Sequence, residues 1–220
     1  PSGGQSLSLV AIGGFGRGEM APYSDIDLLF LSNKRQTGWA KSVVESVLYL
    51  LWDLKFKVGH SSRTISDCVQ LGLDDLTIRT SMLEKRYLCG SRDLFEELET
   101  TLKKKVFSKK ASNFVEGKLS ERAERHLKHA NARYMLEPNI KEGKGGLRDL
   151  HTLYWISKYI YRTDNIQSLI EKKIFKRSEL EIFTEAENFL WFIRCKIHQI
   201  SGYANEKLYF NIQADLAKSL

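Results

Sequence analysis

The sequence has few cysteines and no long hydrophobic run. Its three cysteines, Cys68, Cys89 and Cys195, are far apart and odd in number, so they predict neither a disulfide framework nor a CxxC metal site. The apolar run from Val47 to Trp52 is far shorter than the roughly 20 residues of a membrane span. We therefore expect a soluble protein without a membrane partner, and a reducing, cytoplasmic localisation.

The overall composition excludes several other classes of protein. Of 220 residues, 42% are hydrophobic and 28% are charged, which is ordinary for globular chains and not typical of disorder. Residue 1 is proline and a strand-like pattern begins by Leu7, so we interpret the chain as a piece of a longer protein. The net charge of +7 is compatible with an anionic partner such as nucleotide or nucleic acid, or with solvated lysines on helix surfaces.

The front and the back of the chain have different hydrophobic patterns. Short apolar segments bounded by Gly, Pro, Ser and Asn predict buried strands, and apolar residues spaced by three and four predict a helix that crosses back over the sheet. The predicted strands are 6–12, 26–31 and 56–64, and the predicted helix is 39–56.

From about Asp67 onward the patterns are almost all helical. Helices are predicted over 93–106, over 109–130, from Leu147 onward and over 178–200. We therefore expect an α/β domain over residues 1–107 and a helical domain over residues 108–220.

The segment between the first two predicted strands carries the chemistry. Gly13 and Gly14 allow a sharp turn and bring backbone N–H groups close to a ligand. Ten residues later, Asp25 and Asp27 lie two apart on a strand, so both carboxylates are expected on one face. Adjacent carboxylates repel each other unless a cation lies between them, and Mg²⁺ suits oxygen ligands of this kind. Strand alternation turns Ile26 and Leu28 to the opposite, core-facing side.

This order of motifs, Gly13-Gly14 and then Asp25-Ile26-Asp27-Leu28, resembles the nucleotidyltransferase superfamily of DNA polymerase β. More narrowly, segments including GGFGRGEMAPYSDIDLLFL and LEPNIKEGKGGLRDLHTLYWI resemble the bacterial PII uridylyltransferase/uridylyl-removing enzymes, in colinear order over nearly the whole chain. The resemblance implies an α+β fold, in which a polymerase-β-like nucleotidyltransferase α/β domain is followed by an all-helical domain.

The resemblance also implies roles for individual residues of the first motif. Asp25 and Asp27 match the catalytic carboxylates that bind the metal, and the matching nucleotide-binding residues are Gly13, Gly14, Arg17 and Ser24. Ser24 either bonds a triphosphate oxygen, a metal-bound water or the loop backbone, or it merely closes a turn. Arg17 either contacts phosphate or pairs with Glu19 and braces the loop.

The sequence departs from the superfamily at a third carboxylate on a later strand. Residues Gly59 to Arg63 read GHSSR there, so no general base for the acceptor hydroxyl can be assigned. His60, Asp75 and Glu84 are candidates only, and a lone histidine is more often structural.

A second glycine-rich segment, PNIKEGKGGLRD, runs from Pro138 to Asp149. Lys141 and Arg148 flank its glycines just before the predicted Leu147 helix, whose free N–H groups would favour an anion. We expect Lys141 and Arg148 to bind the nucleotide and Asp149 to cap or brace the helix. A flexible basic loop is the alternative.

The activity implied by the resemblance is Mg²⁺-dependent transfer of UMP from UTP to a tyrosine of the PII signal protein. Removal of UMP and glutamine sensing are expected from separate phosphohydrolase and ACT domains beyond Leu220. An adenylyltransferase with another acceptor and a non-catalytic nucleotide-sensing module are the alternatives. Nucleic acid is not expected as a partner, because no segment interleaves basic and aromatic residues in a strand-tracking pattern.

Overall fold

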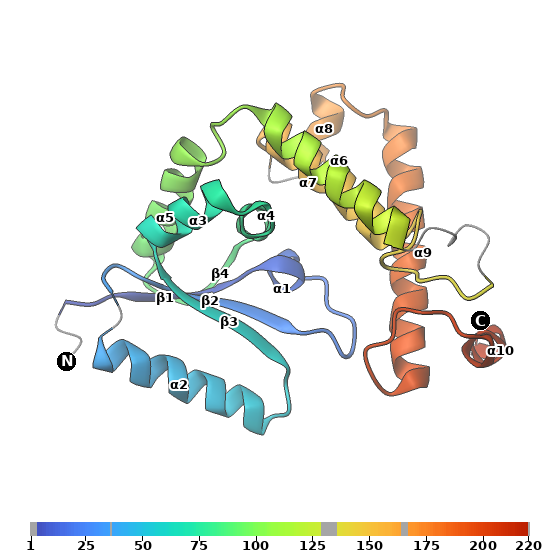
Figure 1. Cartoon of the computed structure of the whole chain (residues 1–220), viewed down its shortest axis with the longest axis horizontal. Helices are drawn as coiled ribbons and strands as arrows, with labels where there is room; N and C mark the ends of the chain where they lie inside the picture. Colours follow the sequence, from blue (N-terminus) through green and yellow to red (C-terminus); the bar gives the residue numbers. More distant parts are fainter. Residues whose placement is uncertain (1–3, 36, 129–135, 164–166, 220) are drawn as a thin grey trace. The chain divides into compact units, whose positions relative to one another are not determined.

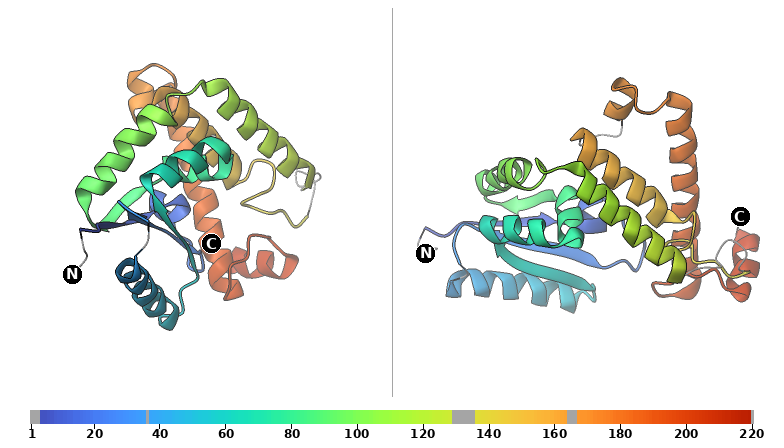
Figure 2. Two further views of the ribbon diagram at one scale, coloured as in Figure 1. Left: turned by 60° about the vertical axis from the view of Figure 1, so that its left-hand side comes forward. Right: turned by 45° about the horizontal axis from the view of Figure 1, so that its top comes forward.

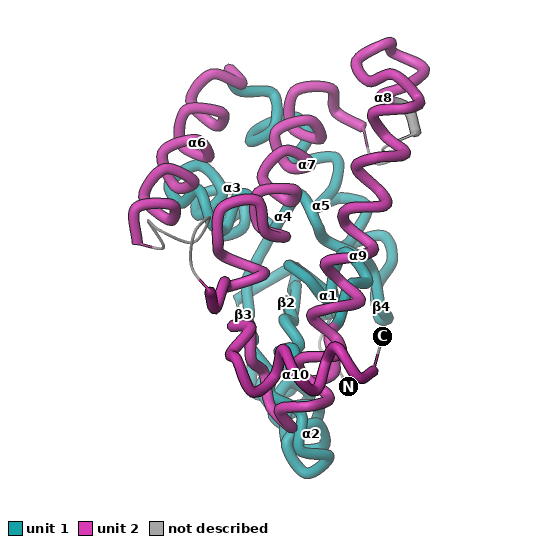
Figure 3. Tube along the Cα trace, turned by 90° about the vertical axis from the view of Figure 1, so that its right-hand side faces the viewer, with its two compact units in different colours: residues 1–20, 24–109 teal, residues 21–23, 110–220 magenta. Residues whose placement is uncertain are grey.

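A computed structural model describes residues 4–35, 37–128, 136–163 and 167–219. The chain divides into two compact units, of which unit 1 holds Pro1–Met20 and Ser24–Lys109 (Figure 3). Unit 2 holds Ala21–Tyr23 and Lys110–Leu220. Unit 1 combines a sheet with helices and unit 2 is helical, which confirms the α+β class. None of the helices in the described ranges has the length and apolar character that crossing a bilayer requires.

A four-stranded sheet with the order β3-β2-β1-β4 forms the centre of unit 1. β2 (Ile26–Ser32) is antiparallel to β1 (Leu7–Ala11) and parallel to β3 (Val58–Thr64). β4 (Arg86–Gly90) pairs antiparallel with the other side of β1. The first three strands were predicted, whereas β4 lies in the region after Asp67 that was expected to be almost all helical, and it was not predicted. This edge strand is short and has no buried residue, so it lacks the alternation that identifies a strand.

Helices cover both faces of this sheet (Figure 1). On one face, Leu28 and Phe30 of β2 form a core cluster with Val44 and Leu48 of α2, and Ile26 packs against it. The opposite face, on which alternate β2 residues are buried, is covered by α3 and α5. The helices of unit 1 are α1 (Gly13–Arg17), α2 (Gly38–Asp53), α3 (Ile65–Asp74), α4 (Leu76–Leu83) and α5 (Arg92–Lys105).

Unit 2 is built on the packing of α7 against α6 and α9, with α10 against α9 (Figure 2). Phe114 of α6 stacks on Tyr159 of α7 with ring centroids 4.1 Å apart. A second cluster joins Ile197 of α9 to Ile212 of α10. The helices are α6 (Ala111–Lys128), α7 (Leu147–Tyr161), α8 (Gln167–Glu171), α9 (Arg177–Ser201) and α10 (Phe210–Ser219). Three of these were predicted, although residues 129 and 130 of the predicted 109–130 helix lie outside the described ranges, and α8 and α10 were not predicted.

Candidate active site

The glycine-rich turn follows β1 directly and forms the short helix α1. The N–H group of Ile12 donates to the carbonyl oxygen of Asp27 at 3.1 Å, so the turn begins beside the acidic strand. Gly13 has a φ of +59°, a left-handed conformation that glycine adopts without steric cost. α1 ends at Arg17 with Gly18 as its C-cap, and the Glu19 N–H donates to the Gly14 carbonyl at 3.0 Å. The predicted sharp turn at these glycines is therefore present.

The two carboxylates of the motif lie at the entry to β2. Asp27 is the second residue of the strand and is partly buried, whereas Asp25 immediately precedes the strand and is exposed. The prediction that both acids belong to the strand was wrong for Asp25. Pairing with β3 starts between the acids, where the Ile26 N–H donates to the carbonyl of Lys57 at 2.8 Å. Burial and then the charge of Asp25 raise the pKa of the Asp27 carboxyl, so the two acids interact electrostatically.

Two glycines enclose the carboxylate of Asp27. Gly59 lies opposite Asp27 in the parallel β2–β3 register, and a Cβ atom added to Gly59 would lie 2.5 Å from Oδ1 of Asp27. A Cβ atom added to Gly13 would lie 3.1 Å from the other oxygen, Oδ2. The absence of side chains at both glycines therefore leaves the space that the carboxylate occupies. From the sequence, Gly59 is distinctive only because it lies in the segment where the superfamily has a third carboxylate and this chain has none.

Two of the three candidates for a general base, Glu84 and Asp75, have hydrogen-bond partners elsewhere in unit 1, and the third, His60, is exposed. Glu84 is buried and accepts a hydrogen bond from Arg17. Asp75 is the N-cap of α4, where its Oδ1 accepts from the Ile78 N–H at 2.8 Å. His60 is exposed next to Trp52. Within the described ranges, no group of three or more His, Cys, Asp or Glu residues could hold a metal ion.

Arg17 has carboxylate partners on both sides. Its Nε donates to Oε2 of Glu19 at 2.8 Å and its Nη1 donates to Oε1 of Glu84. These ion pairs correspond to the loop-bracing alternative for Arg17, and contact with phosphate stays a prediction. Ser24 lies partly buried just before Asp25, and its nucleotide role also stays a prediction.

The second glycine-rich segment is a compact turn in unit 2, and several of its backbone N–H groups donate hydrogen bonds to acceptors within the segment. The Asn139 side chain accepts from the N–H groups of Lys141 and Glu142 at 3.0 and 2.7 Å. At the start of α7, the N–H groups of Leu147 and Arg148 donate to carbonyls at 3.0 and 2.9 Å. The prediction of free N–H groups at this helix start was therefore wrong for these two, because the preceding turn folds back and supplies acceptors.

Asp149 braces this turn against α6, as predicted. Its Oδ2 accepts from the Gly145 N–H at 2.8 Å, and its carboxylate contacts Arg125 and His126 of α6. Burial alone would raise the pKa of Asp149, but the hydrogen bonds from Gly145, His126 and Arg125 hold it below its ordinary value. A carboxylate of the chain itself thus lies among these hydrogen-bond donors.

The two predicted nucleotide-binding cations of unit 2 both face acids. The Nζ of Lys141 lies 3.5 Å from Oε1 of Glu206, and Nη2 of Arg148 donates to Oε1 of Glu142 at 3.3 Å. Glu206 also accepts three hydrogen bonds from Arg194, at 2.6, 2.8 and 3.1 Å. Nucleotide binding by Lys141 and Arg148 stays a prediction, and it would require these cations to exchange or share their carboxylate partners.

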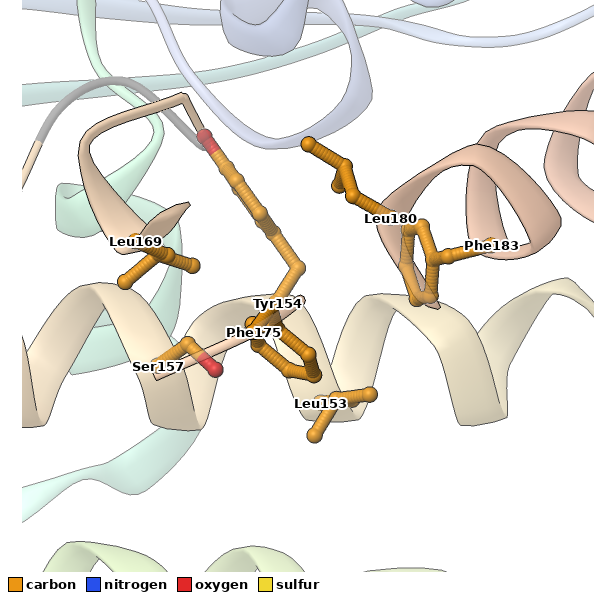
Figure 4. A pocket seen from close by; sticks show the side chains of 7 residues that line it. All are labelled: Leu153, Tyr154, Ser157, Leu169, Phe175, Leu180 and Phe183. Atoms are coloured by element: carbon orange, nitrogen blue, oxygen red, sulfur yellow. The ribbon is translucent and has the colours of Figure 1, made fainter. Parts of the chain in front are cut away.

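Unit 2 also contains an apolar pocket between α7, α8 and α9 (Figure 4). Its lining is almost entirely hydrocarbon and aromatic and includes no charged side chain, so it does not suit a triphosphate. The lining residues are Leu153, Tyr154, Ser157, Leu169, Phe175, Leu180 and Phe183.

The donor set at the entry to β2 fits a divalent cation. Two carboxylates interact across one intervening residue, and the Asp27 carboxyl has a raised pKa partly because Asp25 is negative. A cation between them would relieve this repulsion. Mg²⁺ is commonly bound by one or two carboxylates with substrate phosphates in the other positions, so this pair of side chains fits such an ion, and the role of Asp25 and Asp27 as metal ligands stays a prediction.

Comparison with known proteins gives matches to both units. Residues 3–88 match the family model described as nucleotidyltransferase domain, and residues 113–220 match the one described as GlnD PII-uridylyltransferase. The chain is 52% identical over 217 residues to the bifunctional uridylyltransferase/uridylyl-removing enzyme of Ruegeria pomeroyi, and 49% identical over 217 residues to that of Cereibacter sphaeroides. These matches cover 99% of this chain but 24% and 23% of the two relatives, so the chain spans about a quarter of their length.

Proposed function

Because the chain belongs to the PII-uridylyltransferase family, we propose that it transfers UMP from UTP to a tyrosine of a PII signal protein. The observation that carries the proposal is the Asp27 carboxylate, enclosed by Gly13 and Gly59 next to the charge of Asp25. A pair of fixed carboxylates beside a glycine-rich turn is the arrangement that a metal-bound triphosphate requires.

In the proposed reaction, the tyrosine oxygen forms a new bond to the α-phosphorus of UTP. The bond between that phosphorus and the bridging oxygen of the leaving pyrophosphate breaks, and the phenolic proton is released. Phosphoryl transfer of this kind depends mainly on positioning and on charge stabilisation. A phenol with a pKa near 10 loses its proton more easily than an alcohol, so the reaction depends less on a strong general base.

The residues of the chain have distinct parts in this proposal. Asp25 and Asp27 hold the metal, and the backbone at Gly13 and Gly14 approaches the phosphates. When bound, Mg²⁺ supplies charge neutralisation for the triphosphate. Lys141 and Arg148 of unit 2 contribute positive charge to nucleotide binding.

The wider setting of the proposal follows from the relatives. They are named for both attachment and removal of uridylyl groups, so the transfer described here is proposed as one half of a reversible modification in nitrogen regulation. We propose a cytoplasmic location, and glutamine sensing by domains outside these 220 residues.

The test is radiolabelling of a PII protein with [α-³²P]UTP and Mg²⁺. The double variant Asp25→Asn, Asp27→Asn should lose the labelling while its circular dichroism spectrum stays that of the wild type. Asp53→Asn is a matched control, because Asp53 is an exposed residue at the end of α2 and should label normally.

Three results would contradict the proposal. Undiminished labelling by the double variant would reject the assigned carboxylates. A clear preference for ATP in a panel of nucleotides would favour an adenylyltransferase. Nucleotide binding without any transfer by the wild type would favour a sensing module, the alternative that the missing third carboxylate supports.

A further inference from the structure

The short segment Glu84–Arg86 leads into β4 and holds the glycine-rich turn from the side of β1 opposite to β2. We propose that Glu84 and Arg86 are positioning residues for the nucleotide, because they fix the turn that carries Gly13 and Gly14. This inference rests on the nucleotide-binding part of the proposed function. All residues involved lie in unit 1.

Arg86, the first residue of β4, binds the end of α1. Its Nε donates to the carbonyl oxygen of Gly16 at 3.1 Å, and its Nη2 donates to that of Phe15 at 2.7 Å. The last carbonyls of a helix have no partner inside the helix, so the guanidinium supplies N–H donors to the carbonyl oxygens at the end of α1. The same group lies 5.4 Å from the centroid of the Phe15 ring. A planar fork that makes both bonds at once is specific to arginine.

Glu84 binds the side chain at the end of α1. The Glu84 side chain is only 2% exposed and accepts from Nη1 of Arg17, whose side chain is 11% exposed. Burial alone would lower the pKa of Arg17, but the charges of Glu84 and Glu19 hold it above its ordinary value, so Arg17 keeps its positive charge. Removing one partner of such a buried pair would leave an uncompensated charge, which ties Arg17 to this position.

The backbones of the two segments are also in direct contact. A Cβ atom added to Gly16 would lie 1.8 Å from the carbonyl oxygen of Glu84 and 3.0 Å from that of Ala11. No side chain fits at residue 16 without moving the main chain. The glycine therefore allows α1 to rest on the backbone at Glu84.

The residue between the two positioning residues connects the segment to the rest of unit 1. The side chain of Lys85 is 7% exposed, and its Nζ lies 3.2 Å from Oε1 of Glu99 on α5. The same Nζ lies 6.0 Å from the centroid of the Phe107 ring. Since α5 packs on β1, β2 and β4, Lys85 connects the segment to the helix that covers the sheet.

These contacts bear on the nucleotide through Gly13. The helix α1 that Glu84 and Arg86 hold begins at Gly13, which also borders the Asp27 carboxylate. A displacement of α1 would move the turn and this border together. Such a displacement would move the backbone N–H groups of the turn away from the phosphates, so the loss of either positioning residue should be measurable as weakened binding of the nucleotide.

The test compares Arg86→Met, Arg86→Lys and Arg177→Met by calorimetric titration with Mg·UTP. Arg86→Met should raise Kd about tenfold, and Arg86→Lys should recover only part of the affinity because it cannot make both bonds. Arg177→Met is the matched control, because Arg177 pairs with Glu181 on the exposed surface of α9 and should leave Kd unchanged. In transfer assays, Arg86→Met should raise KM for UTP and leave KM for the PII protein unchanged.

A double-mutant cycle with Arg17→Met and Glu84→Gln gives an independent measurement. If the two residues act as a unit, the double variant should lose no more UTP affinity than either single variant, whereas multiplying effects would reject the pairing. An unchanged Kd for Arg86→Met, with transfer intact in the wild type, would overturn the inference and leave the proposed function standing. Weakened UTP binding by Arg86→Met, with no transfer by the wild type, would support the inference and reject the proposed function.

Discussion

Replacement of Gly59 by alanine should separate the activity of this protein from its stability. The added methyl carbon would lie 2.5 Å from Oδ1 of Asp27, whereas side-chain carbons essentially never approach closer than 3.0 Å. The carboxylate must therefore retreat by at least about 0.5 Å. The other carboxylate oxygen of Asp27, Oδ2, faces Gly13, and a Cβ atom added to Gly13 would lie 3.1 Å from it. Catalytic groups need to be held within about 0.5 Å, and a 1 Å error costs roughly 100-fold, so we expect the transfer rate to fall about 10-fold to 100-fold.

The fold should tolerate Gly59→Ala, because the obstructing atom is the end of a side chain and because alanine costs less backbone entropy than glycine in a strand. The assay is [α-³²P]UTP labelling over a range of Mg²⁺ concentrations, with the melting temperature measured in parallel. Gly38→Ala is the control, because an added Cβ at Gly38 meets no atom within 4 Å. A wild-type rate for Gly59→Ala at every Mg²⁺ concentration would refute the reasoning.

Two further predictions concern stability. The pKa of Asp27 is raised by burial and by the charge of Asp25, so its ionisation costs folding free energy as the pH rises above the ordinary value of 3.8. Asp27→Asn should therefore raise the metal-free melting temperature at pH 7 and give no difference near pH 3, and equal melting at both pH values would contradict this. Burial alone would raise the pKa of Glu206, but Arg194 holds it below its ordinary value of 4.5. Glu206→Gln should lower the free energy of unfolding by about 3 kcal/mol at pH 7, a loss that disappears as the pH falls below 4.5. Chemical denaturation at the two pH values measures this loss, and equal denaturation midpoints for Glu206→Gln and the wild type at pH 7 would refute it.

The strongest periodic patterns identified the elements around the site correctly. The strands near 6–12 and 26–31 and the helix near 39–56 were predicted because each has a regular apolar face that packs on its neighbours. β4 was not predicted, because an edge strand of five residues without a buried position has no such face. α10 was not predicted, although Ile212 and Leu216 pack on α9.

The second glycine-rich segment shows a different reason for an incorrect prediction. Its glycines and cations were correctly expected to precede a helix, but the acceptors for the helix N–H groups and the acid facing Lys141 could not be read from the segment. Glu206 lies far along the chain, and its approach to Lys141 at 3.5 Å depends on the packing of unit 2.

The sequence by itself determined the pair Asp25 and Asp27, the glycine-rich turn before it and the family, because these depend on residue type at short spacing. Only the tertiary structure decided that Gly59 gives Asp27 its space and that the segment at Glu84 and Arg86 holds the turn. Those contacts join residues 32, 67 and 70 positions apart, and strand pairing and core packing, which bring them together, leave no local pattern in the sequence.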